Sequence, residues 1–140
     1  MTKVGLAGLG YWGPNLARNF DELAELAWLC DLSDEQRERF ASRYPEARFT
    51  ADFDEMLADD SLEAVIVATP VVTHAELAKR ALEAGKHVLV EKPPALTGGE
   101  VVEVTREIRA PVAEARESDL RHGVSVTRSS ATRSAARPSP

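Results

Sequence analysis

Three glycines lie close together near the amino terminus, where an apolar run gives way to a helical pattern. In the segment VGLAGLGYWGPNLARNF, residues 4–20, Gly8, Gly10 and Gly13 have the spacing G-x-G-x-x-G. The first glycine allows a tight turn, the second a close approach of backbone to a diphosphate, and the third close packing of helix against sheet. The amino end of the helix would add free N–H groups for the phosphates. The motif therefore predicts a dinucleotide site.

An acidic residue follows at the distance expected for such a site. Asp31 stands eighteen positions after Gly13, at the end of a second apolar run. A carboxylate there can accept hydrogen bonds from the adenosine ribose and would repel a 2'-phosphate, which favours NAD over NADP. Arg37 and Arg39 in the next segment keep NADP open as an alternative. Two simpler interpretations also stay open: the glycines serve only packing, and Asp31 only ends a strand.

Strand and helix signals alternate along the first hundred residues, because apolar runs predict strands and amphipathic segments with capping residues predict helices. In chain order we expect a strand at 3–8, a helix at 13–23, a strand at 25–30, a helix at 34–44 capped by Ser33, a strand at 48–50, a helix at 52–58, a strand within 63–70, a helix at 74–85 capped by Thr73 and ended by Gly85, a strand within 86–94 and a helix at 97–109. This alternation implies an α/β fold with a doubly wound parallel sheet, the Rossmann architecture.

Two further segments come directly after predicted strands. ATPVVTH spans residues 68–74, and VEKPP spans residues 90–94. Because the carboxyl ends of parallel strands meet at one edge of a sheet, both segments should lie beside the glycine loop. The bond between Lys92 and Pro93 is a candidate cis peptide on general prolyl grounds.

Characteristic sequence motifs extend beyond the glycines, in the segments GLGYWGPNLARNF and EAVIVATPVVTHAELAKRALEAGKHVLVEKP. Together with Asp31 they resemble the N-terminal domain of the Gfo/Idh/MocA oxidoreductases, the family of glucose-fructose oxidoreductase and inositol 2-dehydrogenase. The resemblance covers residues 3 to about 108 and is closest to members that act on sugars or nucleotide sugars. It implies hydride transfer between a nicotinamide cofactor and a hydroxyl or keto carbon.

The resemblance also implies roles for individual residues. In the family the lysine of the E-K-P motif, here Lys92, lies near the nicotinamide and the reacting hydroxyl, where its ammonium can orient the alcohol and help its proton leave. The further residues that we assign to the cofactor are Tyr11, Trp12, Thr69, Pro70, His74, Glu91 and Pro93. Three positions keep alternatives: His74 as a hydrogen-bonding residue at a helix start, Lys92 as a structural residue, and Trp12 as a packing residue like Trp28.

The composition of the 140 residues argues against several classes of function. A net charge of -6 offers no broad basic surface for nucleic acid. The apolar stretch near the amino terminus is too short for a signal peptide or a membrane span, so we expect a cytoplasmic protein without a membrane partner. The single cysteine, Cys30, lies within an apolar run, which predicts a buried thiol and no intramolecular disulfide. No metal site is predicted.

The carboxyl-terminal part departs from the family. Members continue into a second domain that supplies the substrate pocket, and their first domain has a sixth strand, whereas this chain has a stretch rich in arginine and serine. We expect a Rossmann domain at 1–110 and a disordered tail at 111–140. Our hypothesis is that the reading frame was lost between about Thr105 and Asp119, and an ordinary solvated basic tail is the alternative. Without a sixth strand, HVLV at 87–90 would be an exposed edge that invites self-association.

Three functions therefore stay open; besides the two that follow, the chain could be a degraded gene product that binds no nucleotide. In the first, the chain is the NAD-binding domain of an oxidoreductase, and a small sugar-like substrate reacts only when a second domain is present. In the second, the chain is a noncatalytic nucleotide-binding fragment that keeps the cofactor site without turnover.

Overall fold

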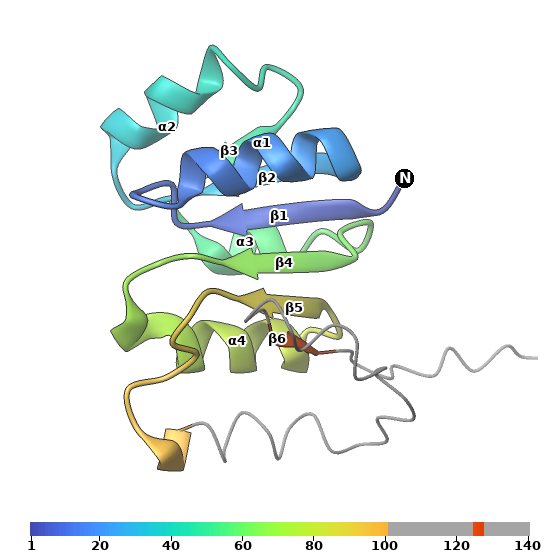
Figure 1. Ribbon diagram of the computed structural model, residues 1–140. Helices are drawn as coiled ribbons and strands as arrows, with labels where there is room; N and C mark the ends of the chain where they lie inside the picture. Colours follow the sequence, from blue (N-terminus) through green and yellow to red (C-terminus); the bar gives the residue numbers. More distant parts are fainter. Residues whose placement is uncertain (101–124, 128–140) are drawn as a thin grey trace, which may run out of the picture.

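The computed structural model describes residues 1–100 and 125–127, which form one sheet with helices on both faces (Figure 1). The elements are β1 (Lys3–Ala7), α1 (Gly13–Leu23), β2 (Glu25–Cys30), α2 (Asp34–Ala41), β3 (Arg48–Thr50), α3 (Phe53–Leu57), β4 (Ala64–Val67), the 3-10 helix η1 (Val71–Thr73), α4 (His74–Glu83), β5 (His87–Val90) and β6 (Ser125–Thr127). Every strand and helix predicted before residue 95 is present, with bounds close to those expected.

The sheet has the strand order β3-β2-β1-β4-β5-β6. Neighbouring strands from β3 to β5 are parallel, and the arrowheads of β1, β4 and β5 point to the same side in Figure 1. The strands that follow β1 in the chain are added first on one side of it, as β2 and β3, and then on the other, as β4 and β5. The predicted doubly wound parallel architecture is confirmed, with its switch point between β1 and β4.

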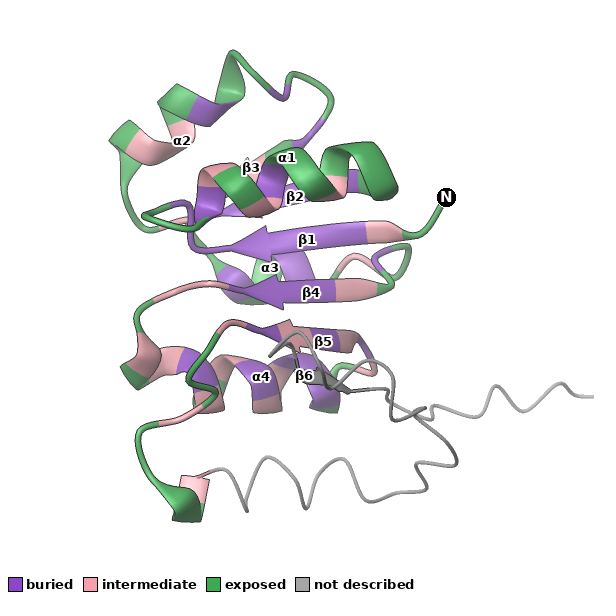
Figure 2. Cartoon of the chain, viewed as in Figure 1, coloured by how far each residue is buried: buried purple, intermediate pink, exposed green. Residues whose placement is uncertain are grey.

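Each face of the sheet has its own apolar core, because successive side chains of a strand point to opposite sides. Leu6 and Ile66 belong to the core that also holds residues of α1 and α2. Val65, Val67 and Met56 belong to the core that also holds residues of α3 and α4. Figure 2 shows β1 and β4 buried along most of their length. Apolar residues at successive positions of a strand are what a sheet covered on both faces requires.

The capping contacts agree with the sequence at two helix ends and differ at a third. Ser33 Oγ accepts the backbone N–H of Gln36 at 3.3 Å, and Gly85 follows α4 with a φ of 75°. The prediction that Thr73 caps α4 is wrong, because its hydroxyl bonds the carbonyl of Pro70 at 2.8 Å. The preceding 3-10 turn leaves Thr73 in helical backbone geometry, whereas a capping side chain needs an extended one.

The strand β6 corrects the expectation that β5 is an exposed edge. Ser125–Thr127 pairs antiparallel with β5, so β5 lies inside the sheet and the ground for predicting self-association is removed. Two of the three residues, Val126 and Thr127, are β-branched and suit an extended strand. This strand also falls within the segment that we expected to be a disordered tail.

The other expectations for the carboxyl-terminal part lie outside the described residues. They are most of the helix at 97–109, the domain boundary at 110 and the lost reading frame. The helix does start within the described part, where Glu100 accepts the backbone N–H of Thr97 and donates its own to the Thr97 hydroxyl. Within the described ranges, no helix is long and apolar enough to cross a membrane.

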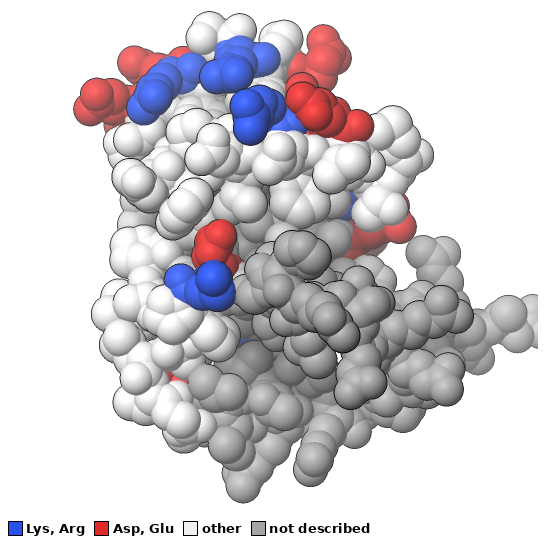
Figure 3. All heavy atoms as spheres, in the orientation of Figure 1, with Lys and Arg blue, Asp and Glu red and all other residues white. Residues whose placement is uncertain are grey.

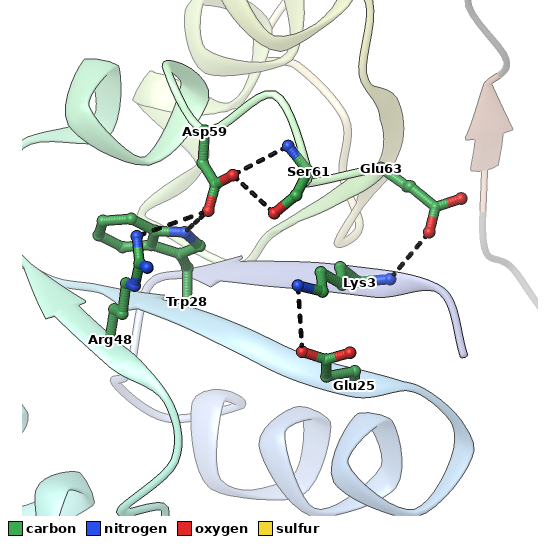
Figure 4. A network of polar contacts seen from close by, with 7 residues as sticks. All are labelled: Lys3, Glu25, Trp28, Arg48, Asp59, Ser61 and Glu63. Carbon is green, nitrogen blue, oxygen red and sulfur yellow. Dashed lines mark hydrogen bonds and ion pairs between the residues drawn. The ribbon is translucent and has the colours of Figure 1, made fainter.

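A polar network surrounds the turn between α3 and β4 (Figure 4). Asp59 Oδ2 accepts the indole N–H of Trp28 at 2.8 Å, and Oδ1 accepts the hydroxyl and the backbone N–H of Ser61 at 2.6 and 2.9 Å. The guanidinium of Arg48 lies 3.8 Å from the same carboxylate. The hydrogen bonds, first from Ser61 and then from Trp28, hold the pKa of Asp59 well below its ordinary value. Trp28 is buried, as predicted.

Acid should weaken this network. Because the folded pKa of Asp59 is depressed, its contribution to stability is complete above the ordinary carboxyl value of about 4 and is lost as the pH falls. We expect Asp59→Asn to lower the free energy of unfolding by about 1 to 2 kcal/mol at neutral pH. Urea unfolding at several pH values should also show a flatter acid dependence in the variant. Asp60→Asn makes the same charge change at the next position and should change neither the free energy of unfolding nor its acid dependence. Equal effects of the two variants would contradict the stabilising role of Asp59.

Candidate functional site

The sequence-predicted site residues come together at one rim of the sheet, on the left in Figure 1. Because β1, β2, β4 and β5 run parallel, the segments that follow them leave from the same edge. The rim receives the glycine loop with Tyr11 and Trp12 after β1, Asp31 after β2, Thr69, Pro70 and His74 after β4, and Glu91, Lys92 and Pro93 after β5. One edge thus holds every residue that the sequence assigned to a cofactor or a reaction.

Gly8 lies where the chain leaves β1 between its two neighbouring strands. Its φ is 96°, and a Cβ at this position would lie 2.5 Å from the backbone carbonyl of Ala68. Its N–H donates to the carbonyl of Cys30 at 2.9 Å, and the N–H of Ala68 donates to Ala7 at 2.8 Å. Both the backbone conformation and the lack of space therefore require glycine here.

The other two glycines of the motif differ in their surroundings. A Cβ at Gly13 would lie 2.9 Å from the carbonyl oxygen of Gly8, which makes Gly13 the close-packing position at the start of α1. A Cβ at Gly10 would meet no atom within 4 Å. The N-cap of α1 is Trp12, which makes no side-chain capping bond, and the first turn holds no acidic residue. The amino end of α1 is therefore open to an anion.

Asp31 has a structural role that the sequence did not suggest. Its Oδ2 accepts the backbone N–H of Leu9, inside the glycine loop, and its Oδ1 accepts the N–H of Ser33, each at 2.8 Å. Each carboxylate oxygen accepts one such bond and keeps further acceptor capacity. Asp31 can therefore hold the loop and still accept hydrogen bonds from a ribose. The interpretation that it only ends a strand is incomplete.

Arg37, which keeps NADP open, is engaged with its own neighbours. Its guanidinium donates to the carbonyl of Asp31 at 2.8 Å and pairs with the carboxylate of Asp34. Arg39 lies farther along α2 and is exposed. Figure 3 shows basic and acidic side chains side by side at the end of the molecule that α2 occupies. These contacts occupy Arg37 with protein groups rather than leaving it open to a 2'-phosphate.

Two aromatic side chains stand out from the glycine loop. Tyr11 is 88% exposed and Trp12 is 51% exposed, and their rings meet edge to face at 5.2 Å. The packing interpretation of Trp12 is therefore wrong. The reason is local: Trp12 stands at the N-cap position of α1 and belongs to neither core, whereas Leu9 in the same loop is buried in one of them.

Two exposed aliphatic residues at the same rim were not singled out from the sequence. Leu32 follows Asp31 directly and is 87% exposed, and Val72 in η1 is 65% exposed. They follow the ends of β2 and β4, the strands on either side of β1. A single apolar residue within the polar stretch after the second strand was the available signal for Leu32.

His74 is 2% exposed and lies between the two loops that follow β4 and β5. Its Nε2 is 2.6 Å from the carbonyl oxygen of Thr69, and its Nδ1 is 2.8 Å from that of Pro93. The peptide bond between Lys92 and Pro93 is cis, as predicted. With both ring nitrogens against backbone carbonyls, the geometry favours the hydrogen-bonding interpretation of His74 over direct contact with a cofactor.

The E-K-P segment begins directly at the end of β5. The N–H of Glu91 donates to Val67 at 2.9 Å, and its carboxylate accepts the backbone N–H of Lys92 at 2.9 Å. Lys92 is exposed, and within residues 1–100 its ammonium makes no hydrogen bond or ion pair. The side chain is therefore available to a substrate at the rim.

Cys30 is buried, as predicted, beneath the carboxyl end of β2. Burial, reinforced by the nearby carboxylates of Asp31 and Asp52, raises its pKa to about 11. The thiol is therefore protonated at neutral pH and unsuited to act as a nucleophile. In the described part of the chain, no group of three or more His, Cys, Asp or Glu residues is arranged to hold a metal ion.

Comparison with known proteins places this geometry in a family. Residues 2–115 match the Gfo/Idh/MocA family, described as an oxidoreductase family with an NAD-binding Rossmann fold. An uncharacterized oxidoreductase of Streptococcus pneumoniae is 37% identical over 99 residues, which are 69% of this chain and 26% of that protein. Levoglucosan dehydrogenase of Pseudarthrobacter phenanthrenivorans is 32% identical over 108 residues, which are 70% of this chain and 28% of that enzyme.

A solved structure agrees with the sequence match. GenD2 from gentamicin A biosynthesis, in complex with NAD, is 34% identical and has a TM-score of 0.72, over 76% of this chain and 31% of GenD2. The chain thus spans less than a third of the length of each of these three proteins. The chain belongs to the Gfo/Idh/MocA oxidoreductase family and represents its NAD-binding Rossmann domain.

Proposed function

We propose that this chain binds NAD across the rim from β2 to β5, and that in the whole protein the cofactor exchanges a hydride with a hydroxyl-bearing carbon of a sugar-like substrate. The contrast among the three glycines carries the proposal. Gly8 and Gly13 have no room for a side chain, which packing alone explains, whereas Gly10 faces open space. A bare backbone facing open space at the amino end of a helix suits a diphosphate.

The two halves of the dinucleotide would lie on opposite sides of the glycine loop. Asp31 marks the adenosine side, since its oxygens can accept hydrogen bonds from ribose hydroxyls. Leu32, directly after Asp31, offers an exposed apolar contact for the adenine. The nicotinamide would then lie toward β4 and β5, near Thr69 and Pro70.

Lys92 is the residue that we propose for the reaction. Bound NAD would supply the hydride acceptor, and its reduced form the donor. The ammonium of Lys92 has no partner within residues 1–100. Lys92 comes shortly after β5, on the side of the rim proposed for the nicotinamide. There it would donate a hydrogen bond to the oxygen of the substrate hydroxyl, orient the alcohol and stabilise negative charge on that oxygen, while the hydride passes from carbon to NAD and the hydroxyl proton passes to water at the exposed rim.

Further observations support a class of substrate, a cellular compartment and a class of partner for the protein. The name levoglucosan dehydrogenase supports a sugar-related substrate, and that enzyme is more than three times as long as the matched span. A second domain would therefore supply the groups that recognise the substrate. The free, buried thiol of Cys30 supports a reducing compartment such as the cytoplasm. The mixture of acidic and basic side chains around α2 argues against a nucleic-acid partner.

A noncatalytic nucleotide-binding fragment is the second candidate function. It is favoured by the span of the match, since the chain covers 31% of the NAD-bound GenD2 structure. Gly10 and Asp31 are proposed contacts for a dinucleotide, whereas Lys92 is the one side chain that we propose for the reaction.

Gly10→Val tests the diphosphate position. A Cβ at Gly10 meets no protein atom, so the variant should fold and melt like the wild type, while its branched side chain would occupy the place of the diphosphate. We expect NADH affinity to fall by about a hundredfold or more, measured by nicotinamide fluorescence. Ala58→Val adds similar bulk at an exposed position and should bind normally. Wild-type affinity for NADH in Gly10→Val would contradict the placement of the diphosphate at this loop.

The choice of cofactor depends on Asp31. Its carboxylate would repel a 2'-phosphate, so NADH should bind at least about tenfold more tightly than NADPH. Asp31→Asn should narrow this ratio, because the substitution removes the charge. Glu35→Gln makes the same charge change at an exposed position and should preserve the ratio. Equal affinity of the wild type for both cofactors would contradict this role of Asp31.

Turnover distinguishes the two candidate functions. We expect the chain to bind NADH but to form none from NAD with levoglucosan or glucose, because one ammonium cannot by itself hold a sugar in position. Absorbance of NADH at its nicotinamide band measures the reaction. NADH formation that disappears in Lys92→Ala would instead show that this chain carries out the reaction itself. Lys92→Ala should keep most of its NADH affinity in either case, because the diphosphate and adenosine contacts are proposed for Gly10 and Asp31 and Lys92 is proposed only for the reaction.

A further inference from the structure

The ring of His74 joins two segments that lie 19 positions apart in the chain. The loop after β4 presents the carbonyl of Thr69 to Nε2 at 2.6 Å, and the loop after β5 presents the carbonyl of Pro93 to Nδ1 at 2.8 Å. At 2% exposure the ring has almost no contact with water that could replace either bond. A buried polar ring in this position must find its partners in the protein.

Both partners are backbone carbonyls, which can only accept hydrogen bonds. Each contact therefore requires a proton on the facing nitrogen, and the ring makes both bonds only with a proton on each. Around it, residues 68–73 carry no ionisable side chain, α4 contributes Glu76 in its first turn, and the β5 loop contributes Glu91 and Lys92.

The ring acts where the sheet no longer holds the two segments together. The ladder between β4 and β5 ends at the pair Val67 and Val90, followed by the bond from Glu91 N–H to the Val67 carbonyl. Beyond this point, the hydrogen bonds that connect the two loops within residues 1–100 pass through His74. The ring thus extends the connection between the strands past the end of the ladder.

We propose that His74 is a positioning residue that fixes the E-K-P loop against the loop after β4, and so sets Lys92 relative to the nicotinamide half of the cofactor. The proposal rests on the function proposed above. Thr69 lies at one end of the bridge, and Lys92 immediately precedes the residue at the other end. The adenosine half depends on Asp31 and the glycine loop, which His74 does not touch.

Loss of the His74 bridge should therefore weaken the binding of the nicotinamide half of the cofactor and leave the binding of the adenosine half unchanged. Gln in place of His74 can donate from its amide nitrogen to one carbonyl but would turn its oxygen toward the other. We expect His74→Gln to weaken NADH binding roughly tenfold, while the affinity for ADP-ribose, which lacks the nicotinamide, stays within about twofold of the wild type. Fluorescence titration and calorimetry measure the two affinities, after thermal unfolding has shown that the variant folds.

The control is His87→Gln, the same substitution at the start of β5, at the opposite edge of the sheet from the rim. It should leave both affinities unchanged. Equal losses of NADH and ADP-ribose in His74→Gln would overturn the positioning role, because a general loosening of the fold affects both ligands. Failure of the wild type to bind either ligand would overturn the proposed function and the positioning role together, whereas normal wild-type binding with an unaffected His74→Gln overturns only the latter.

A measurement on the unsubstituted chain covers the case in which the variant does not fold. The chain has three histidines, so nitrogen NMR can assign the ring of His74 with the help of His87→Gln. The bridge requires a proton on each His74 ring nitrogen, and each such proton, shielded by burial, should exchange slowly with water. A ring nitrogen without a proton would overturn the bridge, since it could not bond the carbonyl that faces it.

Discussion

The backbone at Gly8 passes so close to the end of β4 that a single added carbon would lie 2.5 Å from the carbonyl of Ala68. On its other side, the Gly8 N–H reaches the last residue of β2, Cys30. A side chain would force the segments after β1 and β4 apart, and the φ of 96° would strain any residue other than glycine. The rim depends on this close approach of Gly8 to Ala68, because the glycine loop begins there and both halves of the proposed cofactor site lie beside that loop.

The β2 side of the rim is organised before any ligand arrives. Asp31 accepts backbone N–H groups from Leu9 on one side and Ser33 on the other, so one carboxylate holds the glycine loop and the start of α2 in fixed relation. A site whose donors and acceptors are already held in place loses less entropy on binding. The same carboxylate thus contributes to the shape of the loop and to the choice of cofactor, and the two contributions are coupled, because both oxygens already accept a backbone N–H and Asn at this position would keep only one of them.

Local patterns in the sequence predicted the strands, the switch point and the glycine loop, since each depends on neighbouring residues or on a fixed spacing. Two features that they missed depend on contacts between distant segments, and two others depend on the local geometry of a helix start. The second partner of Asp31 lies 22 positions away, and the strand β6 pairs with β5 from beyond residue 100. Trp12 was misjudged because an aromatic residue beside apolar runs usually enters the core, whereas the helix start that it caps lies outside both cores. The prediction for Thr73 failed because a 3-10 turn intervenes before α4.

The two sides of the rim are held by different means. On the β2 side the contacts are backbone hydrogen bonds to one carboxylate beside the strand ends, whereas on the β4 and β5 side a single buried ring spans the space beyond the last ladder pair. A displacement of either loop on that second side is transmitted to the other through His74, because a rigid ring bonded at both nitrogens cannot follow one partner without pulling on its second. With the positioning role proposed for His74, the loop that carries Lys92 and the loop that would face the nicotinamide would move together, while the two backbone bonds of Asp31 hold the glycine loop to the start of α2.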